Sequence, residues 1–267
     1  MYQLIETISE NHIGTIILND PKKMNALSQP MASEIIRALS EFRFDENIRV
    51  IVFRGAGGRF CAGGDITSMK KRVDAYTTGV RPETETKTNM ENLNRVILLI
   101  RKIEKPVLAW IEGACAGGGL SIAMACDFSF AEEDTKMTCA FVNVGLAPDM
   151  GSTLMMLRRV GPVCSSDLFM TGRRFTGKQA SELGIITAAF PKDELENAVM
   201  TQTKRLAAGP TLAYAEIKAA INRINYSEMY SCMTAEADCA DRLTHTADHA
   251  EAVNAFLEKR KPEFTGK

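Results

Sequence analysis

The first twenty residues alternate apolar and polar positions, which is the period of a half-buried β-strand. Residues 2–9 and 13–19 carry this alternation, and residues 10–12 (Glu-Asn-His) between them supply a turn. This arrangement predicts a β-hairpin. Residues 48–55 (IRVIVFRG) form a short apolar run rich in β-branched side chains. Such a run is typical of a buried strand.

Apolar residues recur at helical spacing in two longer segments of the first half. One follows Ser28, which we expect to be its N-cap, and the other covers residues 91–105, where Pro106 ends it. Further along we expect an alternation of elements: a buried strand (107–113), a helix of small residues (117–126) and two short strands (128–133 and 136–141). The alternation predicts an α/β core with parallel strand pairing.

The strand pattern stops near residue 190. Four helical segments follow, at residues 193–209, 211–224, 229–243 and 246–260. We therefore expect a core formed by residues 1–190 and a helical region formed by residues 191–267. Segment 67–90 is polar and poorly periodic, which favours a mobile loop or a weak helix over a site.

Composition narrows the class of protein. Hydrophobic residues make up 45% and charged residues 24% of the chain, which is ordinary for a globular protein. The net charge of −1 argues against a nucleic-acid binder, and the apolar runs are too short to span a bilayer. Seven cysteines without a C-x-x-C pair, and an N-terminus unlike a secretory signal, predict a cytoplasmic protein with reduced thiols.

Two glycine-rich segments follow predicted strands, at residues 62–64 and 117–119. Glycine lets a ligand approach the backbone, and the first N–H groups of a helix have no partner within it. Two such N–H donors converging on one oxygen would stabilise an oxyanion. The spacing alone leaves open whether the two segments converge, and each glycine run is equally well explained as a tight turn.

Several longer segments resemble signatures of the crotonase (enoyl-CoA hydratase/isomerase) family and occur in the order found there. The resemblance implies a spiral of ββα units followed by a C-terminal helical region that builds homotrimers, often paired into homohexamers. It also implies an acyl-CoA thioester as the substrate. The segments are residues 21–28, 58–66, 105–131, 144–161, 180–191 and 255–264.

The same resemblance implies site residues by position. The N–H groups of Gly64 and Gly118 would form an oxyanion hole for the thioester oxygen. Six further residues would line the path of the adenine and pantetheine groups: Lys23, Met24, Ala26, Ala62, Asp65 and Ile66. Coenzyme A is part of the substrate in this scheme, so we expect no separate cofactor.

Two histidines, His245 and His249, are four residues apart on a predicted helix and would share a face. A metal site would need a third ligand and outer partners as well. We therefore expect no metal site, and we expect both histidines to lie on the solvated surface.

The choice of reaction depends on the acidic residues. Hydratases of the family use two glutamates, and the corresponding positions in this chain hold Ser121 and Phe141. Residues 145–151 instead resemble the L-x-P-D-x-G turn of the family's isomerases, in which the aspartate, here Asp149, is the single acid/base. Dehalogenases of the family need a histidine where this chain has Asn94, which disfavours that reaction.

We therefore predict an enoyl-CoA isomerase in which Asp149 moves a proton from C2 to C4 of a dienolate held by Gly64 and Gly118. On propensity alone Asp149 is as well explained as a helix N-cap. One alternative is a hydratase with non-standard residues, for which Glu112 is a candidate second carboxylate. An alternative of another class is a non-catalytic acyl-CoA-binding protein.

Overall fold

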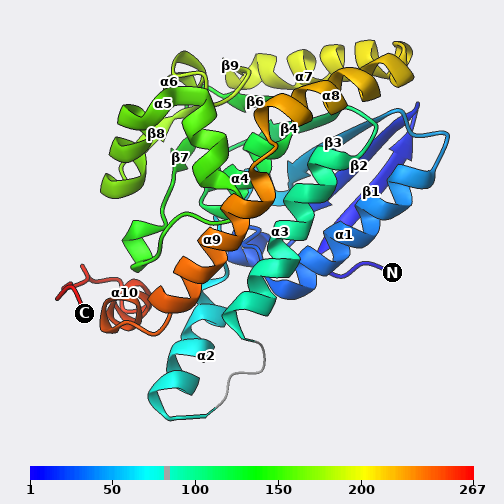
Figure 1. The fold of residues 1–267 in the computed structure, drawn as a ribbon. Coiled ribbons are helices and arrows are strands. Elements are labelled where there is room, and N and C mark those ends of the chain that lie inside the picture. The colour runs from blue at the N-terminus through cyan, green and yellow to red at the C-terminus, as the bar shows by residue number, and fades with distance from the viewer. Residues whose placement is uncertain (81–84) are drawn as a thin grey trace.

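The computed structural model of the chain describes residues 1–80 and 85–267. Its centre is a six-stranded sheet of order β1-β2-β3-β4-β6-β9, in which only the β1–β2 pair is antiparallel (Figure 1). A second sheet has the order β5-β7-β8. The strands are β1 (Ile5–Glu10), β2 (Ile13–Leu18), β3 (Val50–Gly55), β4 (Val107–Ile111), β5 (Ala114–Ala116), β6 (Phe128–Glu132), β7 (Lys136–Thr138), β8 (Arg174–Thr176) and β9 (Ala188–Phe190).

The N-terminal hairpin confirms the prediction from alternation. Ile5 pairs with Leu18 and Glu10 pairs with Ile13, so two residues connect the strands. Those residues, Asn11 and His12, have φ values of 52° and 67°. Positive φ at both central positions is the conformation that continues the twist of a two-residue hairpin.

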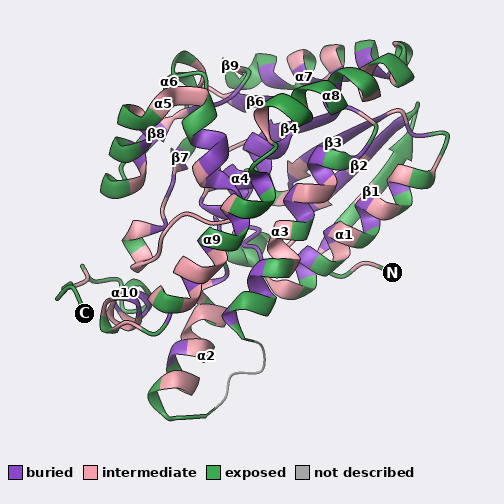
Figure 2. Cartoon of the chain, in the orientation of Figure 1, coloured by how far each residue is buried: buried purple, intermediate pink, exposed green. Residues whose placement is uncertain are grey.

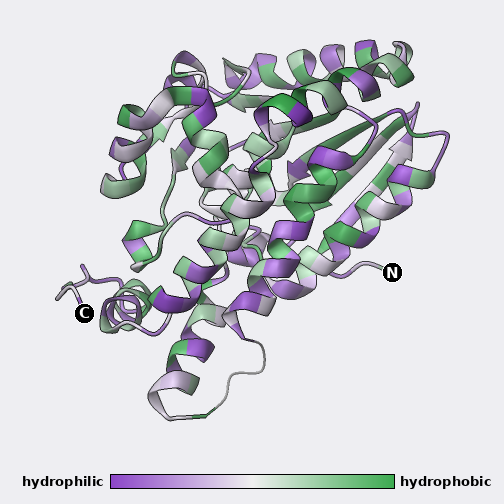
Figure 3. Cartoon of the chain, viewed as in Figure 1, coloured by the Kyte–Doolittle hydropathy of each residue, from purple (hydrophilic) through white to green (hydrophobic). Residues whose placement is uncertain are grey.

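The central strands are buried on both faces, as expected for a parallel sheet covered by helices. Along β3, Val50 and Val52 pack toward α7, whereas Ile51 and Phe53 pack toward α1 and α3. Figure 2 shows β3, β4 and α4 as largely buried, and Figure 3 shows hydrophobic residues concentrated along the central strands. The helices are α1 (Gln29–Phe44), α2 (Ile66–Thr77), α3 (Thr86–Lys102), α4 (Gly118–Ala125), α5 (Ser152–Thr171), α6 (Gly177–Glu182), α7 (Lys192–Ala208), α8 (Thr211–Asn225), α9 (Met229–Leu243) and α10 (Ala247–Leu257).

The expected α/β class and the C-terminal helical region are both confirmed. The last strand, β9, ends at Phe190, and four helices follow it. Helix α7 packs back against the sheet, and α9 packs against α3. The division of the chain at residue 190 and a role of the tail in assembly stay predictions.

Segment 67–90 is more ordered in its described part than its sequence pattern indicates. Helix α2 occupies residues 66–77, and α3 begins at Thr86, five residues before the predicted start. Residues 81–84 of this segment lie outside the described residues. Helix α2 is stabilised at its start by Asp65, whose side chain accepts a hydrogen bond from the Thr67 N–H at 3.1 Å. It is also stabilised by packing against α10, a contact that local periodicity does not reveal.

Candidate active site

The two glycine-rich loops meet. A Cβ atom added to Gly63 would lie 3.2 Å from the carbonyl oxygen of Ala116 and 3.7 Å from the Cα of Gly117. Just before these glycines, Cys61 and Cys115 form an isolated parallel bridge, and the Ala116 N–H donates to the Cys61 carbonyl at 2.9 Å. The absence of side chains is therefore what allows this approach.

Each loop has an N–H group that faces the cavity side of the chain without a hydrogen bond among the described residues. The Leu27 N–H donates to Gly63 O at 2.7 Å and the Asp65 N–H donates to Leu27 O at 3.0 Å, so the Gly64 N–H between them is unused. Gly118 is the first residue of α4, where an N–H has no acceptor within the helix. Both glycines line one cavity. Two free donors in one cavity are the components of an oxyanion hole.

This cavity has a volume of about 470 Å³. The loop before α1, the start of α2, the loop before α5, and α9 and α10 all contribute to its wall. It brings together all nine residues predicted for the isomerase site: Lys23, Met24, Ala26, Ala62, Gly64, Asp65, Ile66, Gly118 and Asp149.

Asp149 lies in the loop between Val144 and α5. Its Oδ1 atom is buried and has no hydrogen-bond partner among the described residues. Burial raises the pKa of Asp149 to about 7, and repulsion from the buried carboxylate of Glu236 adds to the effect. Both causes disfavour the charged form, so at neutral pH this carboxyl group can both accept and release a proton.

Asp149 is not the cap of the following helix, and that interpretation is wrong. The N-cap of α5 is Gly151, which has no side chain that could cap the helix. Glu236, from α9, supplies the carboxylate instead, because it accepts hydrogen bonds from Gly151 N–H at 2.6 Å and Thr153 N–H at 2.9 Å. Sequence reasoning missed Glu236, because its position in an amphipathic helix carries no signal for a contact 85 residues away.

The second carboxylate of the cavity, Asp65, is fully engaged. It accepts hydrogen bonds from Ser68 Oγ at 2.7 Å and from Lys23 Nζ at 3.2 Å, in addition to the Thr67 N–H. Burial opposes ionisation of Asp65, but the Ser68 and Lys23 contacts outweigh it and lower its pKa. Among the described residues of the wall, Asp149 is therefore the carboxylate left free for proton transfer.

The two positions that hold glutamates in hydratases offer no acid or base here. Ser121 is buried and donates its hydroxyl to Gly117 O at 3.3 Å, and Phe141 is buried beside the ring of Phe169. Glu112 does not line the cavity; it lies at the end of β4 with its carboxylate 3.6 Å from the guanidinium of Arg54. The structure thus places Glu112 away from Asp149 and leaves it no direct part in hydration.

The prediction for the histidines is wrong in two respects. His245 is exposed but lies in the turn before α10, so it does not share a helix face with His249. His249 is buried, its Nδ1 lies 2.7 Å from Val144 O, and burial lowers its pKa. The close approach of Gly145 to the His249 backbone explains the burial. Within residues 1–80 and 85–267, no group of three or more side chains could hold a metal ion.

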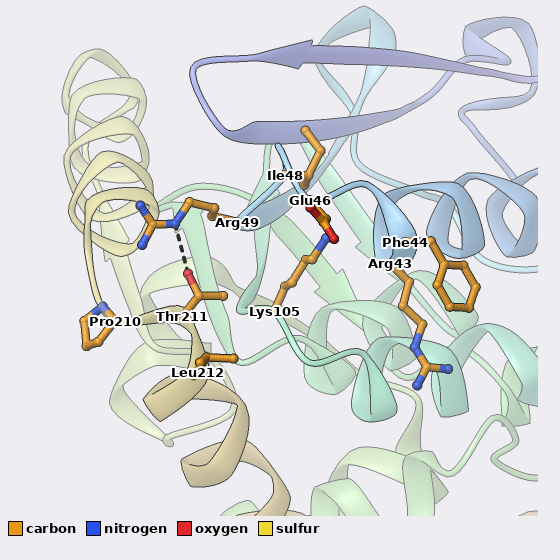
Figure 4. A pocket seen from close by; sticks show the side chains of 9 residues that line it. All are labelled: Arg43, Phe44, Glu46, Ile48, Arg49, Lys105, Pro210, Thr211 and Leu212. Carbon is orange, nitrogen blue, oxygen red and sulfur yellow. Dashed lines mark hydrogen bonds between the residues drawn. The ribbon is translucent and has the colours of Figure 1, made fainter.

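A second cavity, of about 570 Å³, lies far from these groups, between the C-terminal end of α1 and the start of α8 (Figure 4). Its cations are all bound to the protein itself. Arg49 donates to Thr211 Oγ1 at 3.0 Å, Lys105 donates to the carbonyl oxygens of Phe42 and Asp45, and Arg43 pairs with Glu104. These contacts join α1, the loops that carry Arg49 and Lys105, and the start of α8. They account for the charged residues of this cavity without a ligand.

Comparison with known proteins identifies the family of this chain. The family described as enoyl-CoA hydratase/isomerase matches residues 9–267. The chain is 31% identical to the trans-2-decenoyl-[acyl-carrier-protein] isomerase of Streptococcus mutans, over 97% of this chain and 96% of that protein. It is also 31% identical to the 1,2-epoxyphenylacetyl-CoA isomerase of Escherichia coli, over the full length of both.

A solved structure shows the same fold. The crystal structure of an enoyl-CoA hydratase from Mycobacterium avium subsp. paratuberculosis matches with a TM-score of 0.89 and 28% identity, over 99% of this chain and 100% of that one. With a family match that covers almost the entire chain, this protein belongs to the enoyl-CoA hydratase/isomerase (crotonase) family of enzymes.

Proposed function

We propose that this protein is an enoyl-CoA isomerase that moves a 3,4 double bond into conjugation with the thioester, with Asp149 as the acid/base. One observation carries the proposal: an unpaired carboxyl group with a pKa of about 7 lines the same cavity as the free N–H groups of Gly64 and Gly118. A base of this strength beside an oxyanion hole suits the removal of a proton next to a thioester.

The proposed reaction needs three groups of the protein: the N–H groups of Gly64 and Gly118 and the carboxyl group of Asp149. The thioester oxygen accepts hydrogen bonds from the N–H groups of Gly64 and Gly118. The ionised Asp149 takes a proton from C2, and the electron pair of that C–H bond shifts toward the carbonyl to form a dienolate. Asp149 then returns the proton to C4, and the electrons form the C2–C3 double bond. The oxyanion donors contribute as much as the base, since loss of one typically costs about 10²–10³ in rate.

The neighbouring wall favours isomerisation over hydration. Phe141, Leu146 and Met150 are apolar and line the cavity near Asp149, so they limit the access of water. Hydration needs one group to activate water and another to protonate carbon. Ser121 and Phe141 supply neither. Two of the relatives described above are also named isomerases.

A purely binding role is less well supported. Burial of a carboxyl group is unfavourable, and a protein that only binds a neutral acyl group does not need one in its cavity.

In the proposed complex the adenine and pantetheine groups would pass the side of the cavity formed by Lys23, Met24, Ala26, Ala62, Asp65 and Ile66.

The test is a product and exchange assay in D₂O with 3-hexenoyl-CoA and, separately, crotonyl-CoA. We expect the wild-type protein to form the conjugated 2-enoyl isomer, and Asp149→Asn to lose about 10²–10⁴ of the rate. Asp134→Asn is a matched control, because Asp134 is exposed and lies outside the cavity wall. Hydration of crotonyl-CoA that survives in Asp149→Asn would overturn the proposal.

A further inference from the structure

Arg72, in α2, has no hydrogen-bond or ion-pair partner among the described residues. It is half-buried and lines the active-site cavity. Its Nε atom is buried with no hydrogen-bond partner, and no ion pair within residues 1–80 and 85–267 involves its guanidinium. Arginine remains protonated in proteins, so this side chain brings a permanent positive charge to the cavity.

The nearby groups that could neutralise Arg72 are already committed. Asp65 is bound by Lys23, Ser68 and Thr67. The hydroxyl of Tyr76, one helical turn after Arg72, lies 3.3 Å from Thr86 Oγ1. Burial lowers the pKa of Arg72, and attraction to Tyr76 and Asp65 offsets only part of this effect. Such a charge is unfavourable until an anion pairs with it.

The cavity is polar around Arg72. Thr86 and Thr244 both line the wall, are only 2% and 5% exposed, and place their hydroxyl oxygens 3.1 Å apart. Tyr76 connects this hydroxyl pair to the turn of α2 that carries Arg72. Other parts of the wall, such as Met90 and Phe256, are apolar. A ligand that fits this end combines methylene groups with a polar, anionic terminus.

Arg72 lies further along α2 than the residues on the proposed path of the nucleotide. Its Cα follows that of Asp65, the N-cap of α2, by seven residues, or about 10 Å along a helix axis, although its guanidinium still attracts the Asp65 carboxylate. Arg72 also lies close enough to His249, on α10, to lower that residue's pKa by repulsion. The charge of Arg72 therefore acts on both Asp65, at the start of α2, and His249, on the α10 helix that packs against α2.

We propose that Arg72 binds a carboxylate at the distal end of the acyl group, so that the preferred substrate is the mono-CoA thioester of a dicarboxylic acid. This inference rests on the proposed function, because it assigns the acyl chain of the same substrate. The guanidinium would form a two-pronged, charge-assisted contact with the carboxylate.

Calorimetric binding of saturated thioesters tests the inference without any reaction. We would compare adipoyl-CoA and suberoyl-CoA with hexanoyl-CoA and octanoyl-CoA, which differ only in the terminal group. The wild-type protein should bind the diacid thioesters at least about 10-fold more tightly. Arg72→Met should remove this preference and leave the affinity for hexanoyl-CoA unchanged, and Arg72→Lys should retain part of it.

Arg174→Met is the matched control, because Arg174 also lines the cavity but is exposed to solvent. It should keep the diacid preference. Equal weakening of all four ligands by Arg72→Met would mean that Arg72 pairs with a coenzyme A phosphate, and the inference would fail while the proposed function stands. A wild-type protein without preference for diacids also overturns it. If the wild type binds none of the thioesters, the proposed function fails as well.

Discussion

Asp65 and Asp149 show how one side chain acquires opposite properties within one cavity. Asp65 accepts hydrogen bonds from Thr67, Ser68 and Lys23, which lower its pKa and hold it as a structural anion. The Oδ1 atom of Asp149 has no such donor among the described residues, and burial and Glu236 raise its pKa to about 7. The same chemical group is thus a helix cap at one position and, in the proposed mechanism, the base at the other.

The raised pKa of Asp149 predicts a pH-dependent stability. The folded state favours the protonated form of Asp149, and this preference contributes to the free energy of unfolding. The contribution is complete below the unfolded pKa of about 3.9 and is lost as pH rises through about 7. Asp149→Asn removes the ionisation. We expect it to stabilise the protein relative to wild type by about 2–3 kcal/mol more at pH 8 than at pH 5. Urea unfolding of both proteins at the two pH values measures this, and a constant difference would contradict it.

Glu236 should tune the base. Repulsion from Glu236 is the second cause of the raised pKa of Asp149, after burial, so Glu236→Gln should lower that pKa without restoring the ordinary value. In the proposed mechanism the ionised Asp149 is the active form, so the rise of the isomerase rate with pH should move to lower pH. Glu228→Gln, an exposed position at the start of α9, is the control and should leave the pH profile in place. An unshifted profile in Glu236→Gln would show that the two carboxylates are not coupled.

At the scale of elements, the site depends on how closely α4 approaches the loop that carries Cys61. A Cβ atom on Gly119 would lie 2.7 Å from both the Cβ and the carbonyl oxygen of Cys61, whose backbone is held by the bridge to Cys115. A Cβ on Gly64 would meet only the terminal methyl of Met69, which can rotate away. Glycine is therefore required at position 119 because a side chain there would collide with the backbone of Cys61. At position 64 glycine only keeps the N–H group accessible to a ligand.

This difference predicts unequal effects of the same substitution. Gly119→Ala should lower the free energy of unfolding by about 1–3 kcal/mol, because the strand or the helix must move. Gly64→Ala should stay within about 0.5 kcal/mol of wild type. Chemical denaturation of both variants compares them directly. Equal stability of the two variants would mean that α4 is free to shift, and that the oxyanion geometry is not held by packing.

At the scale of the whole molecule, α9 and α10 contribute to the wall of the active-site cavity, whereas α8 presents an apolar surface. Leu212, Ile217, Ile221 and Ile224 of α8 are all exposed. Clusters of exposed apolar residues on one helix mark interaction surfaces. None of the helices in the described ranges has the length and apolar character of a membrane-spanning segment.

The predicted homotrimer or homohexamer is consistent with this surface and can be tested on it. We expect light scattering during gel filtration to give a trimer or hexamer for the wild type. The double variant Ile217→Asp/Ile224→Asp should give smaller particles, because it buries charge in any contact that α8 makes. Glu216→Lys, on the same helix and also exposed, is the control. An unchanged mass for the double variant would place the interface elsewhere.

The sequence by itself determined the elements whose information is local. The hairpin follows from the alternation of residues 2–19 and its turn, and the four C-terminal helices follow from their own periodicity. The hairpin and the helices are readable because each depends on neighbours within a few positions. The resemblance to the crotonase family, and not local pattern, singled out Gly64, Gly118 and Asp149, which line the cavity.

The tertiary structure alone decided how those residues act. The meeting of Gly63 with Gly117 and the capping of α5 by Glu236 join positions 54 and more than 80 residues apart. The burial of His249 and the unpaired charge of Arg72 depend on the packing of α10 against α2. Proton affinity is set by burial and by charges in space, which a one-dimensional pattern does not record.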